Sequence, residues 1–344
     1  MNILITGASG FIGSFIVEEA LRQGMETWAA VRPSSSRKYL ADPRIHFIEL
    51  DFSSQERLEE ALRPHSFDYI IHAAGATKCL NEDTFYEVNT EGTKRLVKAI
   101  LNLQMPIHRF VYLSSLSVMG AIREEQPYQE ITEHDYPRPN TAYGKSKLKA
   151  ERFLESVGNN FPYVILRPTG VYGPREKDYF MMAKSISNHI DFAVGFQRQD
   201  ITFVYVKDVV QAIFLTLDHG MNGRKYFLSD GNVYRSSDFS NLIRKALGNP
   251  WWIRITAPVW VLRIVTSIGE LVARSTGRIS ALNHDKFNIL RQRNWRCDIE
   301  PTMDELGYHP HYDLARGVAE TIDWYKNEGW LGSHRLAYHN TYKK

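Results

Sequence analysis

The chain has 344 residues, enough for one large or two moderate domains with a sizeable core. Its net charge of +3 is close to balanced, so composition gives no reason to expect a nucleic acid or an anionic membrane as partner. The two cysteines, Cys79 and Cys297, exclude a disulfide framework, and no basic stretch precedes an apolar one at the amino terminus, as a signal peptide requires. We therefore expect reduced thiols and a cytoplasmic location.

The first predicted elements are a buried strand, a glycine turn and a helix. Residues 2–6 form a short apolar run, and apolar positions after Gly13 recur with helical period until Gly24. Because glycine has no Cβ, a pyrophosphate can approach its backbone closely, and the following helix supplies N–H groups and a favourable dipole. Gly7, Gly10 and Gly13 between a strand and a helix therefore predict a dinucleotide site, with a simple tight turn as the alternative.

The second predicted strand, residues 27–31, ends at Arg32. In an NAD site an acidic residue usually stands there and bonds the ribose 2′-hydroxyl. A guanidinium instead suits a 2′-phosphate, to which it can bond bidentately. Arg32 therefore favours NADP(H), although NAD remains open, and a solvated basic loop is the alternative interpretation.

Strands and helices continue to alternate through the first half of the chain. One helix is expected over residues 84–103, and another is expected to end at Leu62 after a capping box of Ser53 and Glu56. This alternation predicts an α/β fold with a doubly wound parallel sheet, whose ligands bind beyond the carboxyl ends of the strands. The further strands are expected at residues 46–50, 69–74, 110–113 and 163–166. The residues expected on the ligand-binding edge are Gly7, Asp51, Ala74 and Ser115.

The chemistry is expected in the stretch from Asn140 to Lys149. Tyr143 and Lys147 are four residues apart, so on a helix their Cβ atoms lie about 5–6 Å apart on one face. A phenol has a pKa of about 10, and a neighbouring ammonium lowers it. Such a pair can pass a proton to or from an alcohol or carbonyl oxygen, although a chance pair on an exposed helix has the same spacing.

Taken in order, these pieces resemble the extended short-chain dehydrogenase/reductase family. The resemblance spans nearly the whole chain. It implies a Rossmann domain over residues 1–173, extended by residues 200–232, and a smaller, partly interleaved substrate domain over residues 174–344. The matching pieces are Gly7-x-x-Gly10-x-x-Gly13, Asp51, His72-Ala73-Ala74-Gly75, Asn89, Ser114-Ser115, Tyr143-x-x-x-Lys147, Arg167-Pro168, Val204-Tyr205-Val206-x-Asp208 and Glu305-Leu306-Gly307-Tyr308.

The resemblance also implies roles for individual residues. Tyr143 would exchange the proton, Ser115 would hold the substrate oxygen, and Lys147 would bind the ribose and keep Tyr143 partly ionised. Asp51 would bond the adenine, and Asn89 would serve the proton relay. The residues expected in catalysis are Ser115, Tyr143, Lys147 and Asn89. The residues expected to bind the cofactor are Gly7, Ser9, Gly10, Phe11, Ile12, Gly13, Arg32, Asp51, Phe52, Ala73, Ala74, Gly75, Tyr143, Lys147, Pro168, Thr169 and Val171.

The substrate class is where the chain departs from sugar-nucleotide enzymes of this family. Their epimerases usually carry Arg-Asp where Ile201 and Thr202 stand, so a diphosphate would lose a partner worth on the order of 1.5–3 kcal/mol unless Arg198 replaces it. Their 4,6-dehydratases carry an Asp-Glu pair where Leu116 and Ser117 stand. We therefore expect a secondary alcohol, ketone or aldehyde of apolar character, as in the branch that resembles 3β-hydroxysteroid dehydrogenases and dihydroflavonol reductases. The alternatives are a sugar-nucleotide epimerase with tightly held NAD and a non-catalytic NADP-binding sensor.

An apolar segment near the carboxyl end has three interpretations. Residues 258–277 predict an amphipathic helix, and three charges within it argue against a membrane span. The helix is a lid over an apolar pocket, a core-packing helix or a membrane-surface contact. The predicted apolar stripe is Val259, Leu262, Val265, Ile268, Leu271 and Val272.

The expected partners are a small-molecule substrate and a second copy of the chain. A homodimer through residues 84–103 and 141–156 is implied by the resemblance alone. The histidines show no metal-ligand spacing, so no metal is expected.

Overall fold

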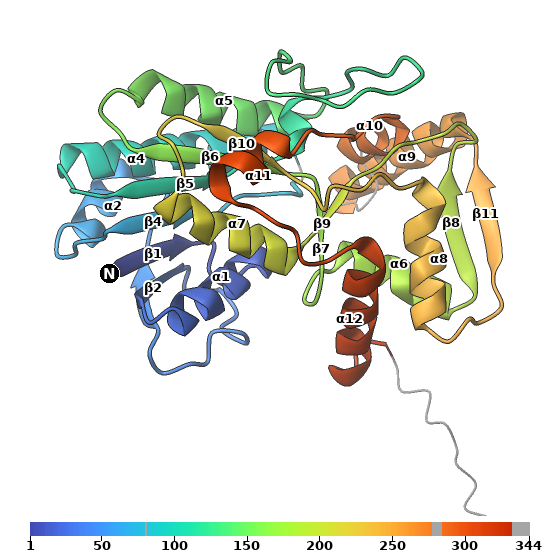
Figure 1. Cartoon of the computed structure of the whole chain (residues 1–344), viewed down its shortest axis with the longest axis horizontal. Helices are drawn as coiled ribbons and strands as arrows, with labels where there is room; N and C mark the ends of the chain where they lie inside the picture. The colour runs from blue at the N-terminus through green and yellow to red at the C-terminus, as the bar shows by residue number, and fades with distance from the viewer. Residues whose placement is uncertain (80, 277–283, 332–344) are drawn as a thin grey trace, which may run out of the picture.

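The computed structural model describes residues 1–79, 81–276 and 284–331, and a seven-stranded sheet is its largest element (Figure 1). The strand order is β10-β6-β5-β4-β1-β2-β3, and all neighbours are parallel. The strands are β1 (Asn2–Thr6), β2 (Glu26–Val31), β3 (His46–Glu49), β4 (Tyr69–His72), β5 (Arg109–Leu113), β6 (Tyr163–Pro168) and β10 (Lys225–Leu228). The order reverses between β1 and β4, which is where such sheets open a ligand crevice. The predicted doubly wound fold is confirmed.

Helices cover both faces of this sheet (Figure 1). On one face, α1 (Phe11–Arg22) and α7 (Val206–Asp218) pack together over one core, while α11 (Glu300–Leu306) contacts α7 and β10. On the other face lie α2 (Gln55–Leu62), α4 (Gly92–Asn102) and α5 (Ala142–Val157). Successive side chains of a strand point to opposite faces of the sheet, so Ile3 packs in the core under α1 and α7, and Leu4 packs in the core under α2, α4 and α5. A strand with both faces covered therefore needs consecutive apolar residues.

Two of the predicted helix boundaries were wrong. The segment expected as one helix over residues 84–103 consists of α3 (Glu82–Phe85), a π-helical turn (Tyr86–Glu91) and α4. Helix α2 begins one residue later than expected, because Ser54 accepts a hydrogen bond from the N–H of Arg57. Ser53 bonds Asp51 instead, so the capping box of Ser53 and Glu56 does not form.

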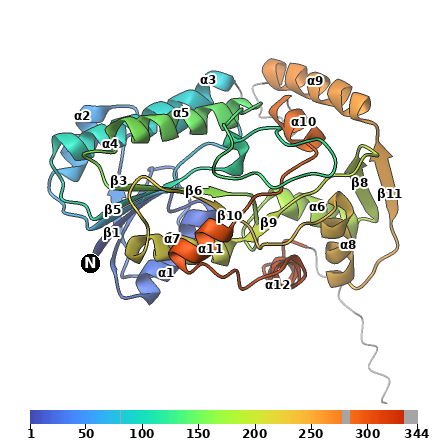
Figure 2. The same ribbon diagram turned by 45° about the horizontal axis from the view of Figure 1, so that its top comes forward.

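A smaller lobe lies beyond the carboxyl edge of the sheet (Figure 2). Its elements are α6 (Asp178–Ser187), β8 (Ile190–Val194), α8 (Ser236–Ala246), β11 (Ile253–Ala257), α9 (Val259–Thr276), α10 (His284–Arg291) and α12 (Leu314–Asn327). Strands β8 and β11 pair with each other, and β7 (Gly170–Tyr172) pairs with β9 (Phe203–Tyr205). Helix α7 and strand β10 return to the main sheet between lobe elements. The division into domains at residue 173 stays a prediction.

Helix α9 forms where predicted, but only part of its predicted apolar stripe is buried among the described side chains. Leu262 and Thr266 are buried, whereas Val265 and Ile268 are exposed. The side chains of Leu271 and Val272, and residue 277, lie outside what the structure describes. Among the described residues, no helix has both the length and the hydropathy that crossing a bilayer demands.

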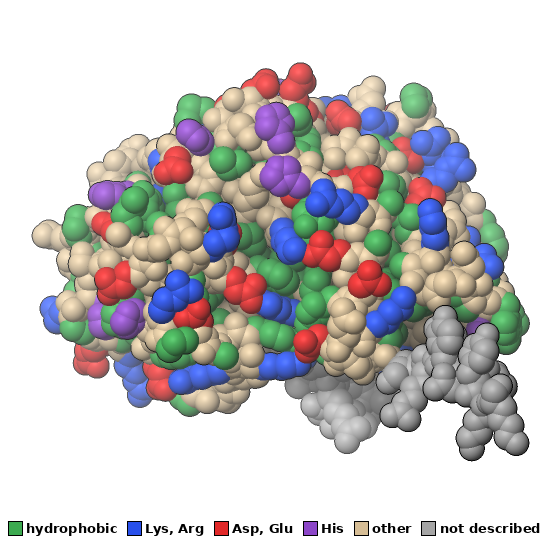
Figure 3. All heavy atoms as spheres, turned by 60° about the horizontal axis from the view of Figure 1, so that its bottom comes forward, with side chains coloured by type: hydrophobic (Ala, Val, Ile, Leu, Met, Phe, Trp, Pro, Cys, Tyr) green, Lys and Arg blue, Asp and Glu red, His purple; other side chains and the backbone are tan. Residues whose placement is uncertain are grey.

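The charged side chains show no single-sign field on the face in Figure 3, where basic and acidic groups are interspersed. This mixture agrees with the nearly balanced net charge of +3. A polyanion such as a nucleic acid would instead favour a continuous basic surface.

Candidate active site

The glycine turn lies at the carboxyl end of β1, beside the residues that follow β4. Gly7 has a φ of +69°, and a Cβ there would lie 2.7 Å from the backbone nitrogen of Ala74. A Cβ on Gly13 would lie 2.1 Å from the carbonyl oxygen of Gly7. Helix α1 starts at Phe11 with Gly10 as its N-cap, and within the described residues no side chain caps it. The first N–H groups of α1 and the bare backbone therefore fit a pyrophosphate, as a dinucleotide cofactor requires.

Two further cofactor candidates follow neighbouring strands of the same sheet. Arg32 is exposed directly after β2, and its backbone N–H donates to the hydroxyl of Ser35 at 3.1 Å. Asp51 follows β3, where it accepts from the backbone and the hydroxyl of Ser53 at 2.9 and 2.6 Å and from Arg57 at 2.7 Å. These hydrogen bonds, those from Ser53 first, lower the pKa of Asp51 to about 2, so its carboxylate is ionised at neutral pH.

The remaining cofactor candidates gather along the same edge. Ser9 and Ile12 belong to the glycine turn and the first turn of α1. Phe52 follows Asp51, and the centres of the Phe52 and His72 rings are 5.8 Å apart. Residues 73–75 follow β4 directly. Pro168 ends β6, Thr169 follows it, and Val171 lies in β7.

Ser115 and Tyr143 meet at the carboxyl end of β5. Ser115 caps the short 3-10 turn Leu116–Val118, where its hydroxyl accepts from the N–H of Ser117 at 3.1 Å. Burial raises the pKa of Tyr143 to about 12, and the neighbouring hydroxyl of Ser115 opposes that rise. The neighbouring Ser114 donates to the buried carboxylate of Glu151 at 2.5 Å. The structure therefore brings Ser115, and not Ser114, to the phenol.

Lys147 lies one turn along α5 from Tyr143, and its ammonium is buried. It donates to the carbonyl oxygen of Leu113 at 2.9 Å and lies 4.9 Å from the centre of the Tyr112 ring. Burial lowers the pKa of Lys147 to about 8, while the charge of Glu151 opposes this shift. A Cβ on Gly75 would lie 3.1 Å from the ammonium, so glycine at that position leaves room for it.

The prediction that Lys147 keeps Tyr143 partly ionised is wrong for the chain alone. The causes that set the Tyr143 pKa are burial and Ser115, and the net shift is upward, to about 12. Desolvation of the phenolate raises the pKa of Tyr143, and burial lowers the pKa of the Lys147 ammonium because it disfavours the charged form there too. At neutral pH Tyr143 is therefore a proton donor.

Asn89 lies in the π-helical turn and is fully buried. Its side-chain amide donates to the carbonyl of Ala76 and to the hydroxyl of Ser146, both at 3.0 Å, and its side-chain oxygen accepts from the N–H of Ala76 at 2.8 Å. The wider π turn is a common device at functional sites. Here it points the Asn89 amide toward Ser146 of α5, which directly precedes Lys147.

A buried hydrogen-bonded chain that the sequence did not reveal leads from the glycine turn to Asn89. The hydroxyl of Thr93 donates to the carbonyl of Asn89 at 2.7 Å, so it must accept from Nε2–H of His72 at 3.0 Å. Nδ1 of His72 then accepts from the hydroxyl of Thr6 at 2.7 Å, which in turn accepts from the N–H of Ala74. Burial lowers the pKa of His72 to about 3, and the charge of Lys147 adds to this, so the ring is neutral.

The carboxylate of Asp285, on α10 of the smaller lobe, closes the first turn of α5. It accepts from the backbone N–H groups of Ala142 and Tyr143 at 2.9 and 3.0 Å. Thr141 caps the N–H of Gly144 at 2.9 Å. A solitary Asp far along the chain gives no signal for this contact, which fixes the backbone of Tyr143 itself.

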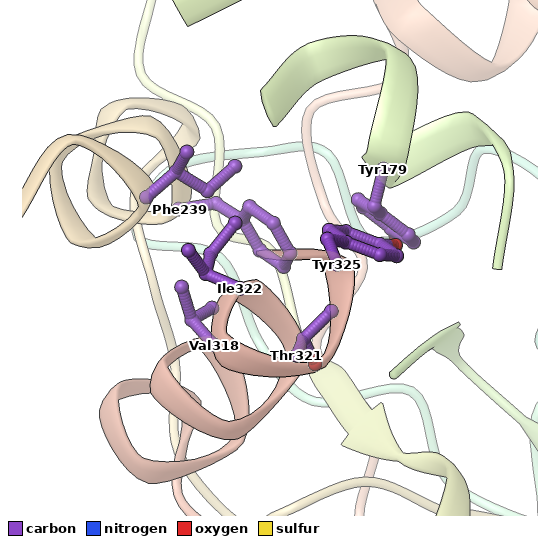
Figure 4. A pocket seen from close by; sticks show the side chains of 7 residues that line it. Tyr179, Phe239, Val318, Thr321, Ile322 and Tyr325 are labelled. Atoms are coloured by element: carbon purple, nitrogen blue, oxygen red, sulfur yellow. The ribbon is translucent and has the colours of Figure 1, made fainter. Parts of the chain in front are cut away.

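The smaller lobe contains a small cavity (Figure 4), and none of the candidate site residues lines it. Its side chains come from α6, α8 and α12, and its volume is about that of one water molecule. We attribute it to imperfect packing, because a substrate would not fit. The lining residues are Tyr179, Phe239, Ile243, Val318, Thr321, Ile322 and Tyr325.

Comparison with known proteins identifies the family. The model of the NAD dependent epimerase/dehydratase family matches residues 3–229. A sterol-4-alpha-carboxylate 3-dehydrogenase (decarboxylating) from Schizosaccharomyces pombe is 25% identical, covering 95% of this chain and 98% of that protein. A 3-beta-hydroxysteroid dehydrogenase from Mycolicibacterium neoaurum is 26% identical, with 94% and 91% covered. A dTDP-glucose 4,6-dehydratase from Streptomyces antibioticus is also 26% identical, with 96% and 94% covered.

Solved structures agree in fold. The dTDP-glucose 4,6-dehydratase from Streptomyces venezuelae, with NAD bound, has a TM-score of 0.78 at 22% identity, and 96% of this chain and 99% of that chain are covered. Because the relatives range from steroid dehydrogenases to sugar-nucleotide enzymes, they do not settle the substrate class. The family match over two-thirds of the sequence places the chain in the NAD-dependent epimerase/dehydratase family of extended short-chain dehydrogenases/reductases, as an oxidoreductase.

Proposed function

We propose that this enzyme transfers a hydride between NADP(H) and a secondary alcohol or its ketone, or an aldehyde, of an apolar substrate such as a hydroxysteroid or a flavanol-like compound. The observation that carries the reaction is the meeting of Ser115 and Tyr143 beside Lys147, at the edge that bears the glycine turn. A phenol and a hydroxyl together can bond one substrate oxygen.

The protonated state of Tyr143 favours carbonyl reduction at neutral pH. The nicotinamide, when bound, supplies the hydride. Tyr143, with its pKa raised to about 12, gives its proton to the substrate oxygen, while the hydroxyl of Ser115 donates a hydrogen bond to the same oxygen. Lys147 would hold the nicotinamide ribose, and the glycine turn with the start of α1 would hold the pyrophosphate.

Three features around the site support an apolar substrate. Ile201 stands where sugar-nucleotide epimerases carry an arginine. Arg198, the possible substitute, bonds both carboxylate oxygens of Asp200 at 2.7 and 3.2 Å. A substrate diphosphate would have to compete with that pair. Leu116, where dehydratases carry an acid, is buried. Two of the relatives described above act on sterols or steroids, which agrees with these departures.

Thr202, at the position of the missing Asp, has a structural role. Its hydroxyl donates to the carbonyl of Trp295 at 2.6 Å and lies 2.9 Å from the hydroxyl of Thr169. Thr169 is one of the residues expected beside the nicotinamide carboxamide. A threonine here therefore supports the cofactor-facing segment after β6 and offers no charge to a substrate.

Arg32 supports the preference for NADP(H). It is exposed after β2, next to the serine-rich turn of residues 34–36. Replacing Arg32 with Ala should weaken NADPH binding roughly 10- to 100-fold and leave NADH binding unchanged, because one charge-assisted hydrogen bond is lost. Arg63→Ala, an exposed arginine after α2, is the matched control. Equal affinities of the Arg32 variant and the parent for NADPH would exclude this role.

The decisive experiment is titration with NADPH and NADH, followed by steroids, flavonoid-like ketones, aldehydes and UDP-sugars as substrates. We expect tighter binding of NADPH and its oxidation by an apolar carbonyl compound. Co-purified NAD with turnover of UDP-sugars, without added cofactor, would instead establish an epimerase. Binding of NADPH without any turnover would indicate a sensor. A homodimer through residues 84–103 and 141–156 and a cytoplasmic location stay predictions.

A further inference from the structure

Glu151 is a buried carboxylate close to the site residues that takes no direct part in the proposed reaction. It belongs to α5, one helical turn after Lys147, and its side chain is fully buried. Ala150 and Leu154 of the same helix pack in the apolar core that also contains residues of β5 and β6. Burying a charge in such surroundings is unfavourable unless partners compensate for it. The position of those partners therefore indicates what the carboxylate does.

The partners of Glu151 come from the ends of two neighbouring strands. The hydroxyl of Ser114, directly after β5, donates to Oε1 at 2.5 Å. The guanidinium of Arg167, near the end of β6, donates to Oε1 at 3.1 Å and to Oε2 at 2.6 Å. Ser114 and Arg167 are both buried. One side chain of α5 is therefore bonded to β5 and to β6 at the edge of the sheet that carries the site.

Each partner of Glu151 directly precedes residues of the site. Ser114 is followed by Ser115, the expected ligand of the substrate oxygen. Arg167 is followed by residues 168–169, which are expected beside the nicotinamide carboxamide. Since the peptide bond is planar and leaves two soft dihedrals per residue, fixing one residue limits where the next can lie. The bonds of Glu151 therefore hold both strand ends at a set distance from α5.

Glu151 also acts on the ammonium of Lys147 through its charge. The two residues are four apart on α5, so their Cβ atoms lie about 5–6 Å apart on one face. Burial lowers the pKa of Lys147 to about 8, and the negative charge of Glu151 acts in the opposite direction. The group that accepts from the ammonium is the carbonyl of Leu113, which carries no net charge. Glu151 therefore favours the charged form of Lys147.

The other titratable groups around this ammonium supply no negative charge at neutral pH. The ring of His72 on β4 is neutral, because burial lowers its pKa to about 3. Burial raises the pKa of Tyr112 on β5 and of Tyr143 on α5, so both phenols keep their protons. Arg167 on β6 is a cation that pairs with Glu151. Of these groups, Glu151 alone is an anion.

We propose that Glu151 is a positioning residue, whose bonds to Ser114 and Arg167 hold the ends of β5 and β6 against the catalytic stretch of α5. The role rests on the proposed function, because it places the hydroxyl of Ser115 beside the phenol and keeps a negative charge near Lys147. Glu151 itself touches neither substrate nor cofactor in this proposal.

A first test removes one bond and leaves the charge. Ser114→Ala deletes the hydroxyl that donates to Glu151, while Arg167 still bonds both carboxylate oxygens. We expect kcat to fall roughly 10- to 100-fold, because Ser115 is no longer held in place, and the Kd for NADPH to stay nearly unchanged. Steady-state kinetics with the carbonyl compound that the enzyme reduces measure kcat. Ser156→Ala, at an exposed serine of α5, is the matched control and should match the parent.

A second test removes the charge and keeps the shape. In the parent, NADPH binding should weaken as the pH rises through about 8, where Lys147 loses its proton. Glu151→Gln takes away the opposite charge, so this midpoint should move down by about one pH unit. Fluorescence titration with NADPH between pH 6 and pH 9 measures it. Glu155→Gln, at an exposed position of α5, should leave the midpoint in place.

The outcomes separate this role from a merely structural one and from the proposed function. A structural role would lower the thermal stability of Glu151→Gln and leave its midpoint equal to that of the parent, which would overturn the proposal. If Glu151→Gln does not fold, Ser114→Ala decides, since full kcat in that variant also overturns it. A parent whose NADPH binding is independent of pH would overturn the role of Lys147 as well. Undiminished turnover in Tyr143→Phe would contradict the proposed reaction and is measured independently.

Discussion

The seven-stranded sheet and the sheet of β8 and β11 differ in where their apolar side chains lie. In the seven-stranded sheet, Ile3, Leu4 and Ile5 are consecutive and all buried, because helices cover both faces. In the sheet of β8 and β11, Asp191 and Arg254 lie on the face toward α6 and α8, whereas Ile190, Phe192, Ile253 and Ile255 lie on the other face and are exposed. A run of consecutive apolar residues in a strand therefore indicates that helices cover both faces of its sheet. Alternation of apolar and polar residues indicates that the two faces differ, but it does not show which face is covered. The catalytic candidates lie in the doubly covered region, where burial can shift a pKa strongly.

The largest effect should come from the centre of the buried region. Tyr143→Phe removes the proton donor and should lower kcat roughly 10²- to 10⁴-fold, while the Kd for NADPH stays nearly unchanged. Steady-state kinetics with the substrate identified among the steroids, ketones, aldehydes and UDP-sugars measure kcat. Fluorescence titration measures the Kd for NADPH. Tyr136→Phe, at an exposed tyrosine, should change neither. Undiminished turnover in Tyr143→Phe would remove the catalytic assignment.

The second prediction compares how much a buried ion pair and an exposed ion pair contribute to stability. Arg167 pairs with Glu151 at 2.6 Å, and both are buried. Arg167→Met leaves the carboxylate unpaired and should lower the free energy of unfolding by about 3–5 kcal/mol in urea denaturation. Arg22→Met, which breaks the exposed pair with Glu19, should have little effect. The idea is wrong if both variants unfold at similar urea concentrations.

A third test uses pH to probe the buried ammonium. Burial lowers the pKa of Lys147 to about 8, so the charged form predominates below that pH and is lost above it. If the ammonium binds the ribose, the Kd for NADPH should rise up to about tenfold between pH 7 and about pH 9. Lys147→Arg keeps its charge and should flatten this dependence. An unchanged pH profile in the variant would contradict the role.

The smallest expected effect comes from the contact between α10 of the smaller lobe and α5. Asp285 of the smaller lobe accepts from the backbone N–H of Tyr143. Asp285→Asn should lower the unfolding free energy by about 1 kcal/mol and kcat a few-fold, because a charged cap of the α5 dipole is weakened. Asp304→Asn, at an exposed position of α11, is the control. If kinetics and stability of Asp285→Asn match the parent, the lobes are not coupled through this cap.

Local sequence patterns predicted much of the fold and the positions of the candidate residues. The strand, glycine turn and helix at the amino terminus depend on neighbours within a few residues, and so does the helical spacing of Tyr143 and Lys147. The order of these motifs along the chain then indicated the family, which the family match confirms. The π-helical turn was missed, because apolar periodicity over residues 84–103 is compatible with an unbroken helix.

The sequence by itself therefore determined the doubly wound sheet, its ligand edge and the residues gathered there. Only the tertiary structure decided which groups surround them: Asp285 reaches α5 across 143 positions of sequence, and His72 bonds Thr6 across 66. It also decided the direction of the Tyr143 pKa and the exposure of the apolar face of β8 and β11. The physical reason is that periodicity is a property of neighbouring residues, whereas burial and charge environment depend on what the rest of the chain places around them.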